Sequence, residues 1–229
     1  MQGQLEILNS ETHRALHMHA DPDEHPHFVM ITMGEFPAAA AVCPIFFSKD
    51  STTGQFYAAA MFGFEPGELL VEGADKGKAV FRPLDLLRQG FFVADENIAI
   101  DPDHPRFGHG ASIALFEEDG RPSAAMRHLQ SAIGQLKTGA DATRELIREL
   151  LELKIIEPVD ISLSFDDGQK LQFDGLYTVS HDALAELDDA QVLALFRKDY
   201  LQAAYCVAFS LNQVGVLARR RNERLTSGL

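Results

Sequence analysis

Residues 159–179 constrain the fold of this chain more than any other part of the sequence. The apolar positions in the first half of this stretch are Val159, Ile161, Leu163 and Phe165, and a polar or charged residue separates each from the next. A period of two is typical of a strand with one buried face. Asp166-Asp167-Gly168 supplies a turn, and the alternation resumes at Leu171 and Phe173. We therefore predict an antiparallel hairpin with those four apolar residues on its inner face, because a slip of one residue would bury polar side chains instead.

Residues 28–118 hold further strand-like segments. Short apolar runs separated by Gly, Pro and Asp lie at 28–33, 41–47, 56–64, 69–71, 91–93, 98–100 and 112–116. Connections this short favour antiparallel pairing. Pro44 indicates an edge strand or a bulge, since proline cannot donate to a sheet ladder. The run at 56–64 is apolar throughout, which predicts a strand buried on both faces.

From residue 123 the hydrophobic period becomes helical. Ser123 can cap a helix that runs to about Lys137, and Gly139 predicts its end. Asp141 can cap a second helix that ends before Pro158, and so short a connection predicts antiparallel packing of the two. Further helices are expected after Ser180, after Asp188 or Asp189, and over about 200–221.

These patterns predict an α+β fold. It has a mainly antiparallel, β-rich N-terminal half, followed by a helical hairpin, a β-hairpin and C-terminal helices. We divide the chain into a His- and acid-rich arm (1–27), a β-rich region (28–118) and an α+β region (119–229). The last two together are within the usual size of one domain.

The charge of the chain argues against two classes of partner. The formal net charge is −14, which repels phosphate backbones and anionic lipid surfaces, so we expect no nucleic-acid or membrane partner. One basic cluster, Arg219-Arg220-Arg221 with Arg224, stands apart from this trend. It is typical of cations at the end of a helix, and the alternative is a site for an anion or an acidic partner.

The two cysteines indicate a reducing compartment. Cys43 and Cys206 are far apart, and each lies in an apolar context. We expect both to be reduced and mostly buried, which fits a cytoplasmic protein. We also expect no membrane span, because no apolar stretch approaches 18–20 residues, and the N-terminus lacks the layout of a signal peptide.

Several short motifs occur in one order along the chain. They are EFPAAA at 35–40 with PIFF at 44–47, FRP at 81–83 with LR at 87–88 and FF at 91–92, LF at 115–116 with DGRPS at 119–123, LKIIEP at 153–158, GLYTVS at 175–180 and SL at 210–211. As an ordered set they resemble the SapC family, which is named from a surface-layer locus. A peptide-transport permease of the same name is unrelated.

The resemblance implies a soluble accessory or binding protein of Gram-negative bacteria, linked to cell-surface or nutrient-uptake functions. It implies no defined activity. The partner would be an unidentified protein or small molecule, and oligomerisation stays open.

The arm concentrates side chains that can bind a metal. His17, His19 and Glu24 match HxHx4E, the core of a cupin metal motif, although its upstream glycine and downstream partner motif are absent. His19 and Asp21 form an HxD pair, two thirds of a non-haem iron triad. The third ligand would be a distal histidine, and the sequence selects none of His104, His109, His128 and His181. The alternative is a solvated arm without a fixed metal, because prolines interrupt it.

Residues 101–110 form a second polar concentration. This connection between strands carries His104, His109, Arg106 and two aspartates, and long loops often carry function. A turn-rich surface loop is the alternative. The sequence contains no GxSxG motif and no phosphate-binding loop.

Three hypotheses remain from the sequence, of which a structural subunit of an assembly is the third, and whether the chain is an enzyme stays open. The first is a SapC-like binding protein without a cofactor. The second is an enzyme that uses iron or another divalent metal, with His17, His19, Asp21, Glu24, His104 and His109 as candidate ligands.

Overall fold

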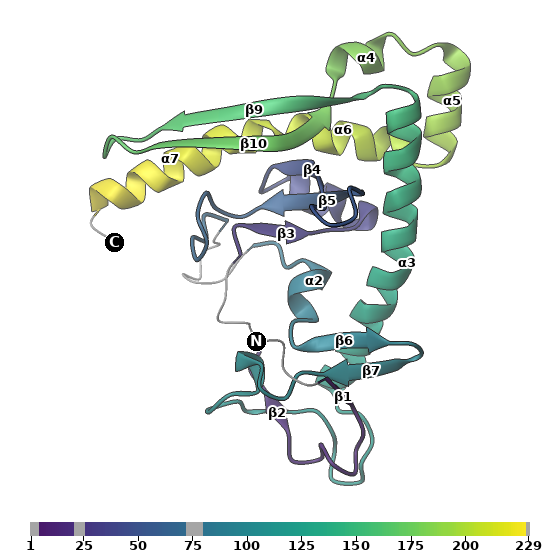
Figure 1. Cartoon of the computed structure of the whole chain (residues 1–229), viewed down its shortest axis with the longest axis vertical. Helices are drawn as coiled ribbons and strands as arrows, with labels where there is room; N and C mark the ends of the chain where they lie inside the picture. The colour runs from purple at the N-terminus through teal and green to yellow at the C-terminus, as the bar shows by residue number, and fades with distance from the viewer. Residues whose placement is uncertain (1–4, 21–25, 72–79, 228–229) are drawn as a thin grey trace. The chain divides into compact units, whose positions relative to one another are not determined.

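The computed structural model describes residues 5–20, 26–71 and 80–227 (Figure 1). The chain has an α+β fold with antiparallel sheets, as predicted. It forms two compact units, each built from two separate stretches of sequence. Unit 1 comprises Met1–Glu24 and Arg82–Thr138, and unit 2 comprises His25–Phe81 and Gly139–Leu229. The boundaries between these units therefore fall near residues 24, 81 and 138, whereas the composition of the sequence changes near 27 and 118.

Unit 1 is a small mixed unit. Its elements are β1 (Glu6–Ile7), β2 (His17–Met18), α2 (Leu84–Leu87), β6 (Phe91–Ala94), β7 (Asn97–Ile100), the 3-10 turn η2 (Pro105–Phe107), β8 (Ile113–Ala114) and the first half of α3 (Ala124–Glu152). The strands pair antiparallel in the order β1-β7-β6, and β2 pairs separately with β8.

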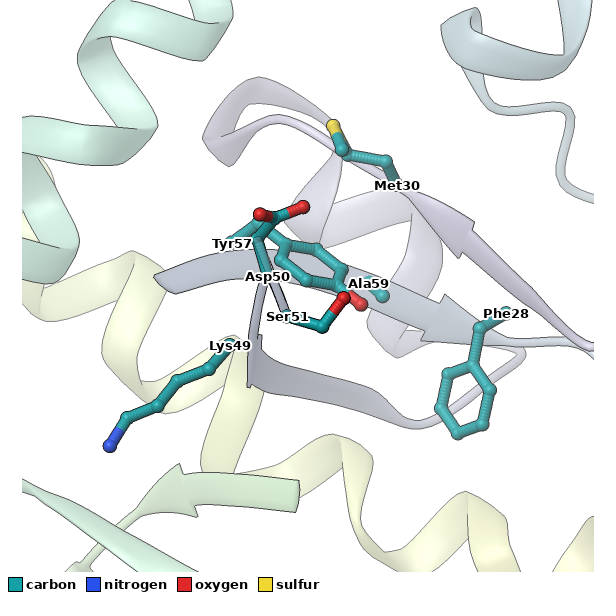
Figure 2. A pocket seen from close by; sticks show the side chains of 7 residues that line it. All are labelled: Phe28, Met30, Lys49, Asp50, Ser51, Tyr57 and Ala59. Carbon is teal, nitrogen blue, oxygen red and sulfur yellow. The ribbon is translucent and has the colours of Figure 1, made fainter. Parts of the chain in front are cut away.

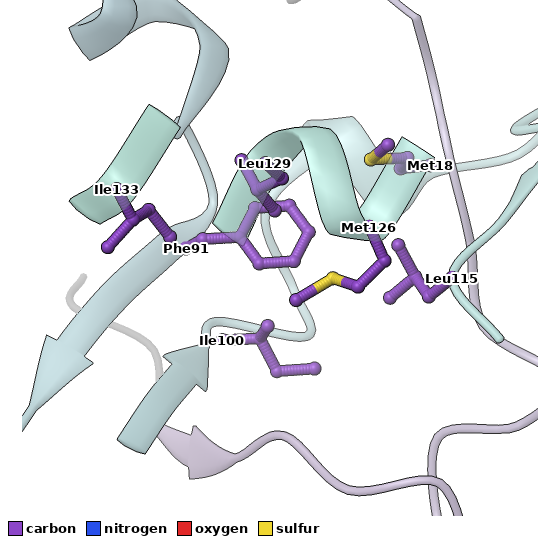
Figure 3. Packing of buried hydrophobic residues seen from close by; sticks show 7 residues of the cluster. All are labelled: Met18, Phe91, Ile100, Leu115, Met126, Leu129 and Ile133. Atoms are coloured by element: carbon purple, nitrogen blue, oxygen red, sulfur yellow. The ribbon is translucent and has the colours of Figure 1, made fainter. Parts of the chain in front are cut away.

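The core of unit 1 joins the arm to the rest of the unit. Its buried residues are Met18, Phe91, Ile100, Leu115, Met126, Leu129 and Ile133 (Figure 3). Ser123 Oγ accepts a hydrogen bond from the Met126 N–H at 3.1 Å and so starts α3, as predicted. Met18 comes from the arm and is only 4% exposed. In the described part of the arm within unit 1, His13 and Met18 are buried, whereas most of the other residues, His17 included, are exposed. A few side chains therefore anchor the arm to unit 1, and the rest of it is solvated.

Unit 2 is built on a five-stranded sheet in the order β3-β5-β4-β10-β9. Its elements are β3 (Phe28–Met30), the 3-10 turn η1 (Met33–Glu35), α1 (Phe36–Ala40), β4 (Ile45–Lys49), β5 (Phe56–Met61), the second half of α3, β9 (Ile156–Ser164), β10 (Lys170–Val179), α4 (His181–Ala185), α5 (Asp189–Arg197), α6 (Tyr200–Ser210) and α7 (Asn212–Ser227). All neighbouring strands in this sheet are antiparallel.

The hairpin predicted at residues 159–179 is confirmed. β9 pairs with β10 from Lys170↔Ser164 to Val179↔Ile156, with a register shift between Phe173 and Leu176. Phe165 and Ile161 are buried, and the polar residues between the apolar positions are exposed. The predicted caps are also confirmed, since Ser180 begins α4 and Asp188 begins α5.

The prediction for Pro44 is wrong. This proline lies directly before β4, which is an interior strand between β5 and β10. The Pro44 carbonyl accepts a hydrogen bond from the Met61 N–H at 2.9 Å. A proline that precedes a strand and supplies only its carbonyl removes no donor from the ladder, so it is compatible with a central position.

The two faces of the sheet differ in what covers them. Residues that lie opposite each other in register share a face. We call the face of Ile45 and Phe47 the helix-covered face, since α1 and α6 pack on β4 and β10 there, with Phe36 ring to Phe47 ring at 6.5 Å. The Ser210 hydroxyl also accepts a hydrogen bond from the Ile45 N–H at 2.8 Å.

We call the opposite face of this sheet the groove face. It carries Met30, Phe46, Tyr57, Ala59 and Leu176.

The predicted helical hairpin at 123–157 is wrong, because α3 continues without a break through Gly139 (Figure 1). The reason lies in packing. A methyl group at position 139 would lie 2.8 Å from Thr32 Cβ and 2.9 Å from its Cγ2 and Oγ1. One turn later, Thr143 Oγ1 accepts a hydrogen bond from the Met33 N–H at 2.8 Å. The glycine therefore allows close approach within unit 2 and does not end the helix.

The arginines of α7 bind a segment of the same chain. Arg221 is buried and donates to Glu65 at 2.7 Å and to Glu68 at 3.2 Å, and its guanidinium lies 4.6 Å from the Phe165 ring centroid. Arg220 donates to the Leu70 carbonyl, and Arg224 to the Leu69 carbonyl. The acidic partner considered for this cluster is thus the segment 65–70 within unit 2.

Two glycines of α3 provide a matched test of the close approach at position 139. We expect Gly139→Ala to lower the free energy of unfolding by about 1–3 kcal/mol, because the added methyl group overpacks against Thr32. Gly134→Ala should raise it by about 0.5–1 kcal/mol, since no atom lies within 4 Å of a methyl group there and alanine favours the helix. Urea denaturation followed by circular dichroism measures both. Equal stabilisation by the two substitutions would show that Gly139 has no packing role.

A second pair of variants tests the arginine cluster. Arg221→Ala should lower the free energy of unfolding by about 2–4 kcal/mol, because it leaves Glu68 largely buried without its cation. Arg219→Ala, at an exposed position of the same helix, should change it by less than about 0.5 kcal/mol.

The difference in the free energy of unfolding between wild type and Arg221→Ala should change with pH in a predictable direction. Hydrogen bonds from Arg221 and Gln169 hold the pKa of Glu65 below its ordinary value of 4.5. A lowered carboxyl pKa stabilises the fold above the unfolded value, and that stabilisation is lost as the pH falls through the folded value. The gap in stability between wild type and Arg221→Ala should therefore narrow below about pH 4.5. A gap that stays constant down to pH 3 would contradict the assignment.

Candidate functional site

The structure brings the arm against the loop that carries the second polar concentration. The His19 N–H donates to the Arg106 carbonyl at 2.8 Å, and β2 pairs with β8 through His17↔Ala114. The His19 ring also lies beside Gly110, since its Cε1 atom is 3.7 Å from where a Cβ of that residue would be. The two candidate regions are therefore neighbours within unit 1, although no sequence motif connects them.

Hydrogen bonds at the ring nitrogens decide which histidines have a lone pair that could coordinate a metal ion. His17 Nδ1 lies 2.8 Å from the Ala15 carbonyl, so it donates, and Nε2 of the neutral ring keeps a lone pair. His104 Nδ1 accepts from the Arg106 N–H at 3.1 Å, so the proton of its neutral ring is on Nε2. His17 could therefore coordinate a metal ion through Nε2. His104 could coordinate one through Nδ1 only after losing the hydrogen bond that this atom accepts from the Arg106 N–H at the start of η2.

The candidate ligands do not form a complete metal site in the described residues. No group of three or more His, Cys, Asp or Glu side chains that could hold a metal occurs in residues 5–20, 26–71 and 80–227. His109 is exposed, and His181 belongs to unit 2. Asp21 and Glu24 lie outside the described residues. The metal hypothesis therefore stays a prediction.

A hollow surface lies on the groove face of unit 2. One cavity of about 510 Å³ is lined by Phe28, Met30, Lys49, Asp50, Ser51, Tyr57 and Ala59 (Figure 2). A second, of about 480 Å³, is lined by His27, Phe28, Phe46, Ser48, Tyr57, Ala59, Gln172, Phe173, Asp174 and Leu176. The two share Phe28, Tyr57 and Ala59, so they adjoin and run across β3, β5, β4 and β10. We call the joint surface the aromatic groove.

The floor of the aromatic groove is held by edge-to-face ring packing. The Phe28 ring centroid lies 6.3 Å from that of Phe46 and 6.3 Å from that of Phe173, at interplanar angles of 64° and 69°. Phe46 is fully buried, whereas Phe28, Tyr57 and Phe173 are half-buried. A buried ring thus fixes the positions of partly exposed ones, and those exposed ring surfaces are available to a ligand.

Polar groups stand at both ends of this floor. Asp50 Oδ1 accepts hydrogen bonds from the N–H groups of Thr52 and Thr53 at 3.0 and 2.7 Å, and also from the Thr53 hydroxyl. These bonds lower the pKa of Asp50, the Thr53 N–H contributing most. At the other end Asp174 accepts from Gln172 Nε2 at 3.1 Å. An apolar floor with a few polar groups is the usual composition of a small-molecule site.

No pattern in the sequence indicated the aromatic groove. The run at 56–64 predicted a strand buried on both faces, and β5 is buried from Ala58 to Met61, whereas Tyr57 is partly exposed. The lining residues come from four strands between positions 27 and 176, so no local motif joins them. The available signal was the polar, turn-forming Asp50 next to an aromatic strand.

The cysteines have the reduced state that was expected. Both are free; Cys43 is buried and Cys206 is partly exposed, so the expectation of two mostly buried thiols holds fully for Cys43 alone. Burial raises the pKa of Cys43 to about 12 and raises that of Cys206 as well. The Cys43 thiol donates to the Ala39 carbonyl at 3.3 Å and is not a nucleophile at neutral pH.

One stretch of the chain meets the length and hydropathy expected of a membrane-spanning helix, contrary to the sequence-based expectation. Residues Tyr200–Thr226, which form α6 and α7, reach a mean hydropathy of 1.3 over 18 residues, and 33% of that window is buried. Core helices of soluble proteins meet the same criterion. Ala204, Val207 and Leu217 of this stretch are fully buried, whereas Phe209 is 55% exposed.

Comparison with known proteins places the chain in a family. No curated protein and no solved structure matches it. A sequence model of the SapC family matches residues 8–217, a range that covers most of each unit and all the strands that line the aromatic groove. Because this match covers most of the 229 residues, the chain belongs to the SapC family.

Proposed function

We propose that this SapC-family chain is an accessory binding protein, linked to cell-surface or uptake functions, that holds a ligand in the aromatic groove of unit 2. The observation that carries the proposal is the pair of adjoining cavities over an aromatic floor. The partner is a small molecule or a short segment of a protein. The link to surface or uptake functions rests on family membership.

The physical basis of binding is the burial of apolar surface with polar groups to orient the ligand. Transfer of apolar area from water contributes about 25 cal/mol per Å², and half-buried rings already fixed by neighbours lose little entropy when a ligand covers them. Ser51, Gln172 and His27 supply hydrogen-bonding groups around this floor. A rigid sheet is a suitable support for such a surface.

Charge and thiol chemistry support the compartment and the classes of partner in this proposal. The net charge of −14 disfavours nucleic acid and anionic lipid. A buried free thiol at Cys43 is compatible with the reducing conditions of a cytoplasm. We therefore propose a cytoplasmic protein without a nucleic-acid or membrane partner.

A substitution that fills the groove tests the proposal. Ala59 lines both cavities, so Ala59→Leu should weaken the binding of small aromatic fragments by about tenfold or more, because its side chain occupies their space. Ala190→Leu, at an exposed position of α5, is the control and should have no effect. Nuclear magnetic resonance with a fragment panel measures both, and circular dichroism verifies folding. Fragments that bind Ala59→Leu and wild type equally would reject the groove as the site.

The metal-dependent enzyme is the second candidate function, and one observation favours it. The His19 backbone is bonded to the loop that contains His104 and His109, which brings candidate ligands of the arm and the loop into one unit. Iron or another divalent metal would be the cofactor.

Elemental analysis separates the two functions. We expect no stoichiometric transition metal after mild purification, because a working site needs three or more ligands held by packed partners. About one iron, zinc or manganese per chain that is abolished by His17→Ala or His19→Ala, and retained in His181→Ala of unit 2, would instead make the enzyme the first choice.

A further inference from the structure

The aromatic groove carries negative charge at two separate places. Asp50 lies in the turn after β4 and lines the first cavity, and Asp174 lies on β10 and lines the second. Both carboxylates are exposed, and the hydrogen bonds described above leave each with a second oxygen. Tyr57 lies between these positions, because it lines both cavities.

The cationic side chain nearest to this surface is directed elsewhere. Lys49 contributes to the first cavity, but its Nζ lies 4.9 Å from the Phe56 ring centroid and 5.2 Å from the Tyr177 ring centroid. Phe56 pairs with Lys49 and Tyr177 pairs with Phe47, so both rings lie on the helix-covered face of the sheet. Figure 2 shows the Lys49 side chain pointing away from Tyr57. Among the residues that line the cavities, His27 is the other group that can carry positive charge, and its ring packs edge-on against Phe28 at 5.1 Å.

This arrangement matches the chemistry by which proteins bind organic cations. The face of an aromatic ring attracts an ammonium or guanidinium group, and a nearby carboxylate adds a charge-assisted hydrogen bond. An anionic ligand would meet two carboxylates, because Lys49, which is the one Lys or Arg among the lining residues, directs its Nζ toward the Phe56 and Tyr177 rings. A neutral apolar ligand would pack on the aromatic rings and make no ion pair or hydrogen bond with the carboxylates.

We propose that the aromatic groove binds an organic cation, with an amine or guanidine group beside Asp50 or Asp174 and its apolar part on Phe28, Tyr57 and Phe173. The proposal rests on the proposed binding function and names the ligand class. A free amine and a basic side chain at the end of a peptide share this chemistry.

Three probes of nearly equal shape test the charge preference. They are phenethylammonium, 2-phenylethanol and 3-phenylpropanoate, titrated into the ¹⁵N-labelled full chain at low ionic strength. The amide signals of Asp50, Ser51, Tyr57 and Asp174 are followed. We expect phenethylammonium to bind about 3–10-fold more tightly than the alcohol, since exposed charge pairs and cation–π contacts contribute modestly, and the carboxylate to bind most weakly.

Two conservative variants assign the preference to the carboxylates. In Asp50→Asn the side-chain oxygen can still accept from Thr52 and Thr53, and in Asp174→Asn it can still accept from Gln172, so the local structure is kept. The double variant should lose most of the preference for the amine over the alcohol, and the part that remains comes from the cation–π contacts with the rings. Asp160→Asn, on β9 and outside the lining residues, should keep the wild-type preference.

The outcomes distinguish this inference from the function on which it rests. If the alcohol or the carboxylate shifts the groove signals at the same concentration as the amine, the cation preference is wrong, whereas binding in the groove stands. If none of the three probes shifts those signals, both are rejected. Free phenethylammonium and a Gly-Gly-Arg-amide peptide, compared in the same titration, separate the two sources of the cation.

Discussion

The pairing of β10 with β4 is the interaction on which the rest of unit 2 depends. Leu176 lies opposite Ser48 and Tyr177 opposite Phe47, so this ladder joins strands that are more than 120 residues apart in the sequence. Without it the β9–β10 hairpin would be separate from the strands of the N-terminal half. The five-stranded sheet, the helix-covered face and the aromatic groove all require that one junction.

Register at this junction also separates the residues of the core from those of the proposed binding surface. Along β4, Ile45 and Phe47 face α1 and α6, whereas Phe46 and Ser48 face the groove. Alternation along one strand thus places a packed core on one side and a partly exposed aromatic surface on the other. The packed side explains the stability of the support, and the exposed side explains why a ligand would bind there.

The functional proposals follow from this geometry and from family membership together. The SapC family match establishes what the chain is related to, and the cavities indicate where a ligand would lie. The His-rich arm, which is the most conspicuous feature of the sequence, belongs to unit 1 as far as Glu24 and contributes Met18 to the core of that unit. Met18 therefore has a packing role, and metal binding by the histidines of the arm stays a prediction.

Features that depend on neighbouring residues could be predicted from the sequence: the α+β class, the hairpin at 159–179, the caps at Ser180 and Asp188, and the SapC family. The sequence also predicted an edge at Pro44 and a helix end at Gly139, and both were wrong. In each case a distant partner decided the outcome: Met61 bonds to the Pro44 carbonyl, and Thr32 occupies the space beside Gly139. The aromatic groove likewise exists only in the tertiary structure, because its residues come from four strands whose order is set by long-range pairing and not by local pattern.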